Sequence, residues 1–173
     1  MGREVRRVPA DWQHPKHPNG KYVPLFEQTT PLEGKIAKWN EENELWKAGK
    51  HPDQLKKRLE SNKYAPSKYP NFEDWDGGPP NPDDYMPYWP ESERTHYQMY
   101  ETVTEGTPIS PVLDSPEILA RWLADNNANA YAGHCATYEE WLAMCRRGWA
   151  PTSVLYKNGD IVGGVAYVAK VSE

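Results

Sequence analysis

Two pairs of residues in this sequence have the side chains that catalysis or metal binding would need. Cys135 follows His134, and a nucleophilic cysteine requires a base within hydrogen-bond reach of its thiol. Adjacent side chains seldom point at each other, so we interpret Cys135 as a loop cysteine and Cys145 as a packed one. His14 and His17 have the spacing of half a zinc site, but the two cysteines lie far along the chain and cannot be expected to complete it. We therefore expect no catalytic residue, no metal site and no cofactor.

A second kind of chemistry would be the binding of a phosphate-bearing small molecule. Arg94 and His96 lie close together in sequence, and Arg146 and Arg147 are adjacent further along. Arginine binds phosphate oxygens, and nucleobases stack on Trp or Tyr rings. A protein that binds or sequesters a nucleotide with these four residues is therefore one alternative. The P-loop, Rossmann and serine-hydrolase motifs are absent from the sequence, so an enzyme would need an unrecognised site, for which His96 and His134 are the candidates.

The most distinctive stretch is an acidic and aromatic segment between residues 73 and 105. It contains nine Asp and Glu residues, and Arg94 is its only Lys or Arg. Aromatic anchors with charge around them are typical of protein–protein interfaces. The same rings could fasten the segment to the protein's own core, and the two roles do not exclude each other. The predicted partner-binding residues are Asp74, Trp75, Asp76, Asp83, Asp84, Tyr85, Tyr88, Trp89, Glu91 and Glu93.

Charge is distributed unevenly along the 173 residues. Residues 1–70 carry 14 Lys and Arg against 9 Asp and Glu, whereas residues 71–125 carry 2 against 12. The whole chain has a formal net charge of -5, so we do not expect it to bind nucleic acid directly through phosphate contacts. Its acids could instead imitate nucleic acid and occupy a basic groove of another protein.

The sequence also predicts where the protein acts. No apolar run approaches the roughly 20 residues of a membrane-spanning helix, and the basic start of the chain has no apolar stretch like that of a signal peptide. Only two cysteines are present, which is too few for a disulfide framework. We therefore expect a reducing, intracellular compartment and no membrane partner.

The elements that must position these side chains differ between the two halves of the chain. Repeated X-Pro steps predict an extended basic arm over residues 1–30, followed by a helical segment over 31–61. Residues 62–94 combine proline, glycine, acids and aromatics, which favours an irregular segment. Residues 95–173 have the patterns of a small α+β core, and we expect the whole chain to form one compact unit.

Two sites have the capping-box pattern of a helix start. Thr30 and Glu33 predict a helix that ends at Gly49, and Thr137 and Glu140 predict another near the end of the chain. A further helix is expected to begin after Ser115, where the side chain can cap and proline follows.

Strands are expected on either side of these last two helices. The alternation over residues 95–104 predicts a strand with Tyr97 and Met99 on one face and Gln98 and Tyr100 on the other. Asn158-Gly159 lies between two apolar runs, 153–156 and 161–168, and predicts a β-hairpin. The predicted fold class is α+β, a small antiparallel sheet with a C-terminal β-hairpin packed by two to four helices, plus an irregular N-terminal half rich in proline and aromatic residues.

Several blocks of the sequence resemble a family of uncharacterised proteins carried by tailed bacteriophages and prophages. The blocks are GREVRRVPADWQHP, KYVPLFEQ, DDYMPYWPESERTHYQMYETVTEGTPISPV, SPEILARWLADN and GWAPTSVL. The resemblance covers most of the chain and implies a phage or mobile-element origin and expression in the bacterial cytoplasm. It implies no catalytic residues.

These observations together favour a phage accessory protein that binds a host protein and modulates or inhibits it. An anti-defence role, possible through an acidic surface that mimics nucleic acid, is the sharper form of this hypothesis. The alternatives are a protein that binds a nucleotide or another small molecule, and a minor component of the virion. The identity of the partner and the oligomeric state stay open at this stage.

Overall fold

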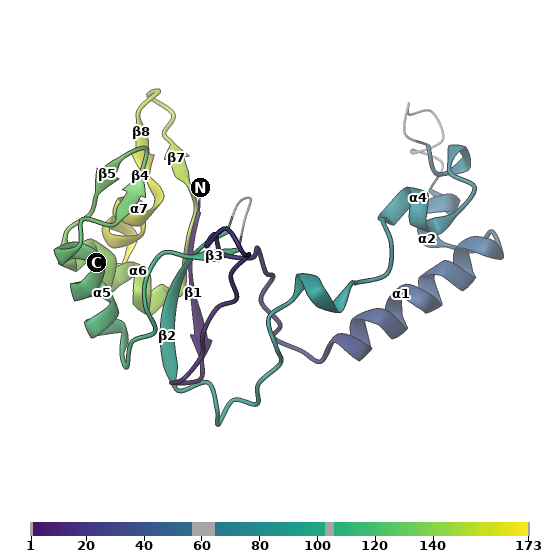
Figure 1. Ribbon diagram of the computed structural model, residues 1–173. Helices are drawn as coiled ribbons and strands as arrows, with labels where there is room; N and C mark the ends of the chain where they lie inside the picture. Colours follow the sequence, from purple (N-terminus) through teal and green to yellow (C-terminus); the bar gives the residue numbers. More distant parts are fainter. Residues whose placement is uncertain (1, 57–64, 103–105, 173) are drawn as a thin grey trace. The chain divides into compact units, whose positions relative to one another are not determined.

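The computed structural model describes residues 2–56, 65–102 and 106–172, and the chain forms two compact units. Unit 1 comprises Met1–Glu27 together with Trp89–Glu173, and unit 2 comprises Gln28–Tyr88 (Figure 1). This division differs from the expected single unit with an N-terminal arm, because the first residues of the chain pair with a strand almost a hundred residues later.

Unit 1 is built on a four-stranded antiparallel sheet with the order β3-β2-β1-β6. The strands are β1 (Arg3–Val8), β2 (His96–Glu101), β3 (Thr107–Pro108) and β6 (Trp149–Ala150). β1 pairs with β2 along its whole length, from Arg3 opposite Glu101 to Val8 opposite His96. The prediction of an extended arm over residues 1–30 was therefore wrong for its first part, which is an inner strand.

The basic residues of β1 can occupy an inner strand because their charges have partners. Arg3 is buried, forms an ion pair of 3.3 Å with Glu101 and donates from Nε to the Asn129 carbonyl oxygen at 3.0 Å. Arg6 is also buried and donates to the Leu25 carbonyl oxygen at 2.7 Å. A buried charge is tolerated only with such compensation, and these partners lie far away in sequence, where a local pattern cannot reveal them.

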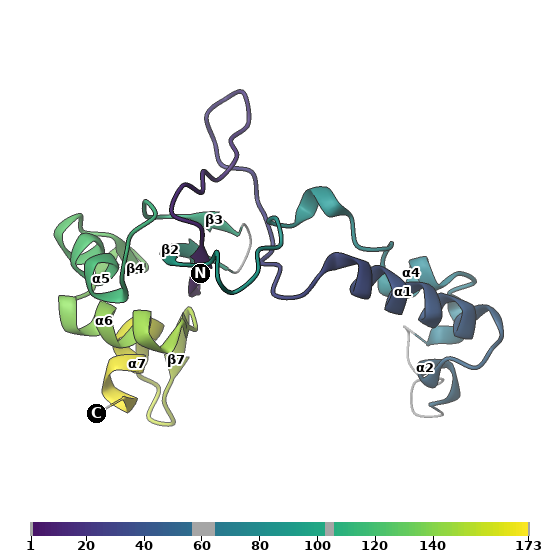
Figure 2. The same ribbon diagram turned by 90° about the horizontal axis from the view of Figure 1, so that it is seen from below.

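Three helices cover one face of this sheet: α5 (Pro116–Asp125), α6 (Tyr138–Arg147) and α7 (Gly164–Val171) (Figures 1 and 2). Both predicted helix starts are confirmed, since Ser115 caps α5 and Thr137 forms a capping box with Glu140 at α6. The hydrophobic core lies between helices and sheet, and its members include Met99, Leu119, Leu123, Trp141, Met144 and Val168. The α+β fold class is confirmed.

The C-terminal hairpin is also present, but it is shorter than predicted. β7 (Ser153–Leu155) pairs with β8 (Ile161–Gly163) around a turn in which Gly159 has a φ of 91°. The prediction of a strand over 161–168 was wrong beyond Gly163, where α7 begins. A side chain at Gly164 would collide with the Pro151 carbonyl oxygen, and this tight approach bends the chain out of the strand.

A second, unpredicted hairpin lies beside α7. It is formed by β4 (Asn129–Tyr131) and β5 (His134–Cys135), whose register is irregular.

Unit 2 is mostly helical and short elements dominate it. They are α1 (Leu32–Lys47), α2 (Pro52–Leu55), the 3-10 helix η1 (Pro66–Lys68), α4 (Phe72–Asp76) and the 3-10 helix η2 (Pro82–Asp84). The predicted cap at Thr30 was wrong, because Pro31 is the N-cap and no N-cap side chain bonds the first turn. The first turn is bonded by Gln28 instead. With its amide turned so that both of its ends find partners, the Gln28 oxygen accepts from the Leu32 N–H and the Gln28 nitrogen donates to the Met86 carbonyl oxygen.

Candidate functional site

The structure divides the predicted partner-binding residues between the two units. Unit 2 contains Asp74, Trp75, Asp76, Asp83, Asp84, Tyr85 and Tyr88, and unit 1 contains Trp89, Glu91 and Glu93. The predicted partner-binding residues therefore belong to two compact units and not to one.

Several of these side chains make contacts inside their own unit. The Trp75 ring stacks on Trp46 at 5.7 Å between centroids, and the Trp89 ring meets Trp12 edge-on at 4.8 Å. Glu91 accepts from Arg7 and from Arg94. These residues hold the segment to its own unit, which is the structural role that the sequence left open for the rings.

Two of the predicted tyrosines line a groove in unit 2. This acidic groove lies between the first turns of α1 and residues 82–88, and it has a volume of about 460 Å³. Met86 and Leu32 are buried at the groove, and Ile36 adds a further apolar side chain. Tyr88 remains 45% exposed, which leaves its ring available to a partner.

The rim of the acidic groove carries carboxylates. Glu33 lines the groove, and Asp83 and Asp84 lie between two other lining residues, Pro82 and Tyr85. All three acids are exposed, and in the part of the chain that the structure describes none of them has a Lys or Arg partner. The acidic groove therefore combines an apolar floor with exposed carboxylates, and the Lys35 ammonium beside it lies 4.6 Å from the centroid of the Tyr85 ring.

Asn81 holds the backbone that carries these aspartates. Its side chain accepts from the Asp83 N–H at 3.2 Å, and its carbonyl oxygen accepts from the Asp84 N–H at 3.1 Å. The other two acids of unit 2 that the sequence predicted as partner-binding lie on α4, where Asp74 accepts from the Asn71 amide and Asp76 is exposed.

The residues predicted for a small-molecule site do not come together in one cavity. Arg94 pairs with Glu91 at 2.7 Å at the approach to β2, whereas Arg146 pairs with Glu117 at 3.1 Å on the helices. Arg146 and Arg147 together line a groove of about 390 Å³ at the ends of α6 and α7, but neither Arg94 nor His96 lines it. The acidic groove is lined by none of the four residues.

His96 takes part in a chain of polar contacts that the sequence did not suggest. Its Nδ1 lies 2.9 Å from Thr95 Oγ1, and its Nε2 lies 3.1 Å from Asp114 Oδ1. Hydroxyl, imidazole and carboxylate follow one another here as they do in nucleophilic hydrolases. The Asp114 side chain is 77% exposed, however, so water screens its pairing with the imidazole. Thr95, His96 and Asp114 line neither the acidic groove nor the groove of unit 1 that is described below.

The other candidate residues have ordinary structural surroundings. Cys135 is exposed and its thiol contacts the Asn127 carbonyl oxygen, while burial raises the pKa of Cys145 to about 12. Both ring nitrogens of His14 have hydrogen-bond partners inside unit 1. Among the described residues, no group of three or more His, Cys, Asp or Glu is placed to hold a metal ion.

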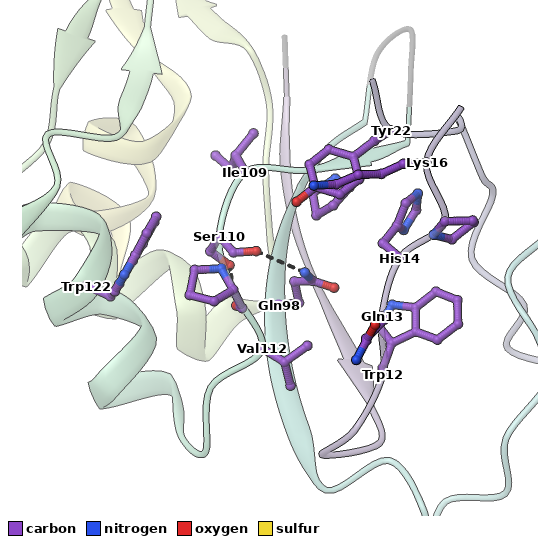
Figure 3. A pocket seen from close by; sticks show the side chains of 13 residues that line it. Trp12, Gln13, His14, Lys16, Tyr22, Gln98, Ile109, Ser110, Val112 and Trp122 are labelled. Carbon is purple, nitrogen blue, oxygen red and sulfur yellow. Dashed lines mark hydrogen bonds between the residues drawn. The ribbon is translucent and has the colours of Figure 1, made fainter. Parts of the chain in front are cut away.

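A second groove lies in unit 1, and sequence reasoning missed it. This aromatic groove has a volume of about 940 Å³ and lies beside β2, from which Gln98 lines it. One wall is the segment after β1, with Trp12, His14 and Tyr22, and another is the segment 108–112 (Figure 3). Trp122 from α5 also lines it. The signal available in the sequence was the pair of proline-rich stretches, PADWQHPKHP and TPISPV, that flank its walls.

A buried hydrogen-bond network forms the floor of the aromatic groove, and Tyr100 is its centre. The Tyr100 hydroxyl accepts from Trp12 Nε1 at 3.1 Å and donates to Gln98 Oε1 at 2.7 Å. Gln98 Nε2 donates to the Ser110 carbonyl oxygen at 2.9 Å. His14 Nδ1 lies 3.1 Å from the same hydroxyl. Gln98, Ser110 and His14 are each more than nine-tenths buried, so the floor is rigidly built.

Burial controls the protonation of this network. It lowers the pKa of His14, assisted by the nearby Arg6 charge and opposed by the hydrogen bond to the Val23 carbonyl oxygen. Burial likewise raises the pKa of Tyr100. The groove floor is therefore lined by neutral groups, and Lys16 is the charged side chain that borders it.

Comparisons with protein-family models, with curated proteins and with solved structures found no match for this chain.

Within the described residues, no helix is both long and apolar enough to cross a membrane.

Proposed function

We propose that this chain is a binding protein of a tailed bacteriophage that attaches to a protein of the bacterial host in the host cytoplasm and modulates or inhibits it. The resemblance of its sequence blocks to phage proteins supports the origin. The acidic groove of unit 2 supports the binding role.

One observation carries this proposal. Tyr85 and Tyr88, predicted from sequence as partner-binding residues, line a groove whose floor is apolar and whose aspartates, Asp83 and Asp84, have no cationic partner among the described residues. Protein interfaces commonly combine an apolar anchor site with a charged rim. The complementary partner segment would present an aliphatic or aromatic side chain flanked by Lys or Arg.

The charge of the rim predicts how such a complex responds to salt. Exposed charges separated by more than about 10 Å are screened at 0.1 M salt, so association that depends on the rim slows as salt rises. The apolar floor is not screened, and it should keep a residual affinity at high salt.

The test is affinity purification of the tagged protein from bacterial lysate, followed by measurement of binding to the purified partner. D83N/D84N is expected to weaken binding about tenfold at low salt, since charge pairs at interfaces commonly contribute more than 1 kcal/mol. D11N/D125N removes the same charge from exposed positions of unit 1 and should bind like the wild type.

A second pair of variants tests the apolar part of the site. Y88A should weaken binding at both low and high salt, whereas Y156A, which removes a similarly exposed tyrosine from unit 1, should not. A partner whose affinity is unchanged by both D83N/D84N and Y88A would place the interface elsewhere and refute this proposal.

Mimicry of nucleic acid is the sharper form of the proposal, and it has its own test. If the exposed acids occupy a DNA-binding groove of the partner, duplex DNA must compete with this protein for the partner. A partner that binds DNA and this protein simultaneously, with unchanged affinities, would exclude mimicry while leaving host-protein binding intact.

A further inference from the structure

We propose that the aromatic groove of unit 1 binds a proline-rich polypeptide segment of a partner protein, held in the extended polyproline II conformation. This site is separate from the acidic groove, which belongs to unit 2, and it does not rest on the function proposed above.

Some hydrogen-bonding groups of the aromatic groove are already used within the protein. Carbonyl oxygens of three lining residues already accept bonds: Pro15 from the Val23 N–H, Ser110 from the Gln98 amide, and Pro111 from the Ser110 hydroxyl. These acceptors are therefore engaged within the protein itself.

Several donors, in contrast, are left over. The Trp122 indole N–H and the Tyr22 hydroxyl have no hydrogen-bond partner among the residues that the structure describes. Gln98 has two amide N–H groups and uses one of them for Ser110. No carboxylate is among the described side chains that line the groove, and the exposed Gln13 amide at the rim adds both a donor and an acceptor. With these donors available and no carboxylate among the described lining side chains, the groove can bind a ligand rich in hydrogen-bond acceptors.

A proline-rich segment has this composition. Each proline contributes a carbonyl oxygen and no N–H, and polyproline II leaves those oxygens unbonded within the chain. Aromatic-lined grooves recognise such segments because the proline rings pack on aromatic faces and little conformational entropy is lost. The Trp12, Tyr22 and Trp122 rings would supply the faces, and a groove of about 940 Å³ is large enough for several proline residues.

Addition of a β-strand to the sheet is a poorer use of this surface. β3 is the edge strand that borders the groove, and Pro108 within it, like Pro111 beyond it, has no N–H to donate to an added strand. The wall of the groove therefore disfavours pairing and leaves contact with side chains as the mode of recognition.

Lys16 adds a preference for charge. Its ammonium lies 4.7 Å above the Tyr22 ring, and none of the described carboxylates pairs with it. A proline-rich segment with an acidic residue beside the prolines would therefore bind more tightly than prolines alone, by a margin that falls with salt.

The experiment uses the full chain and two synthetic probes, a capped hexaproline peptide and the same peptide flanked by glutamates. Binding is followed by titration calorimetry and by the indole ¹H–¹⁵N resonances of Trp12 and Trp122. We expect saturable binding with a Kd of about 10–500 μM, the weak range in which ΔG of binding is about -5 to -7 kcal/mol. The Trp122 indole N–H resonance should shift, and a glycine–serine peptide of equal length should not bind.

Conservative variants separate recognition from folding. Y22F keeps the ring and removes its donor, and it is expected to weaken binding about fivefold, the effect of one lost hydrogen bond. W122F removes the indole N–H and leaves a smaller aromatic ring, so it should weaken binding at least as much. K16Q should weaken binding of the glutamate-flanked probe about threefold and leave hexaproline unaffected, whereas K21Q, on the same segment but outside the groove, should change neither. Far-UV circular dichroism must match the wild type in every case.

The proposal is overturned if neither proline probe binds saturably at millimolar concentration, if the glycine–serine peptide binds as well, or if W122F/Y22F binds hexaproline like the wild type. D83N/D84N should leave hexaproline binding unchanged, so a failure here and a failure of the acidic groove are distinguishable.

Discussion

At the scale of single residues, Tyr100 and His14 show how a polar group can be central to a core. The Tyr100 hydroxyl can donate only one proton, yet both Gln98 Oε1 and His14 Nδ1 lie within hydrogen-bond distance of it. A neutral His14 that donates from Nε2 to the Val23 carbonyl oxygen, 2.6 Å away, needs that proton at Nδ1, so it competes with Gln98. A protonated His14 would satisfy every partner, but burial and Arg6 oppose the charge.

The lowered pKa of His14 makes the stability of unit 1 dependent on pH. Because the folded pKa lies below the unfolded value of about 6.5, the unfolded chain binds the proton more readily. The contribution of neutral His14 to the free energy of unfolding is therefore fully present above about pH 6.5. This contribution is lost as the pH falls from that value to the lower pKa of His14 in the folded protein. Urea denaturation at pH 7.5 and pH 5.0 measures this loss.

H14Q removes the titrating group, and H17Q removes an exposed histidine of the same segment as the control. We expect the stability difference between the two pH values to be smaller in H14Q than in the wild type and unchanged in H17Q. An H14Q protein with the full wild-type pH dependence would assign the acid sensitivity to the carboxylates instead.

At the scale of elements, identical sequence motifs had different outcomes. Thr137 and Thr30 each precede a glutamate by three residues, but only Thr137 accepts from the N3 backbone N–H, that of Glu140, at 3.2 Å. Thr30 is displaced from the cap because α1 begins at Leu32 behind Pro31, and Gln28 reaches the first N–H group. A capping motif predicts a helix start well, but the residue that caps it depends on where the preceding chain runs.

This difference is measurable with two matched substitutions. T137A should lower the free energy of unfolding by about 1 kcal/mol, the usual effect of losing an N-cap hydrogen bond. T30A should change it by less than about 0.5 kcal/mol, as expected for an exposed residue without that role. Denaturation followed by circular dichroism gives both values, and equal losses in the two variants would mean that Thr30 caps α1 in solution.

At the scale of the whole molecule, the chain leaves unit 1 after Glu27 and returns to it at Trp89. The sheet of unit 1 is completed only by that return, because β1 lies between β2 and β6. Among the residues that the structure describes, the core cluster of unit 1 is made of residues of unit 1 alone. Unit 2 has its own cluster, in which Phe72 and Trp75 pack on Trp46.

Unit 1 should therefore fold without unit 2. A chain in which residues 28–88 are replaced by a flexible glycine–serine linker is expected to unfold cooperatively and to keep the near-UV signal of its buried Trp141. The same chain without residues 1–8 should not fold, since it lacks an inner strand. A linker chain without cooperative unfolding would show that unit 2 is required for the core of unit 1.

Features that depend on residues a few positions apart could be predicted from the amino-acid sequence. The caps at Ser115 and Thr137, the Asn158-Gly159 turn and the two faces of the strand around Met99 all follow from local backbone chemistry and side-chain alternation. The acidic and aromatic character of the segment that contains Tyr85 and Tyr88 was equally visible.

Which of these side chains share a surface depends on contacts between distant segments, and it could be seen in the folded protein alone. The sequence of β1 predicted a basic arm because the partners of Arg3 lie about a hundred residues away. They are the Glu101 carboxylate, which forms an ion pair with it, and the Asn129 carbonyl oxygen, which accepts its hydrogen bond. The aromatic groove brings together Trp12, Gln98 and Trp122 from three segments that are distant in the sequence. The predicted acidic residues, although close in sequence, belong to two different units. Contacts between distant segments are set by how the whole chain buries its apolar surface, and no local pattern records that choice.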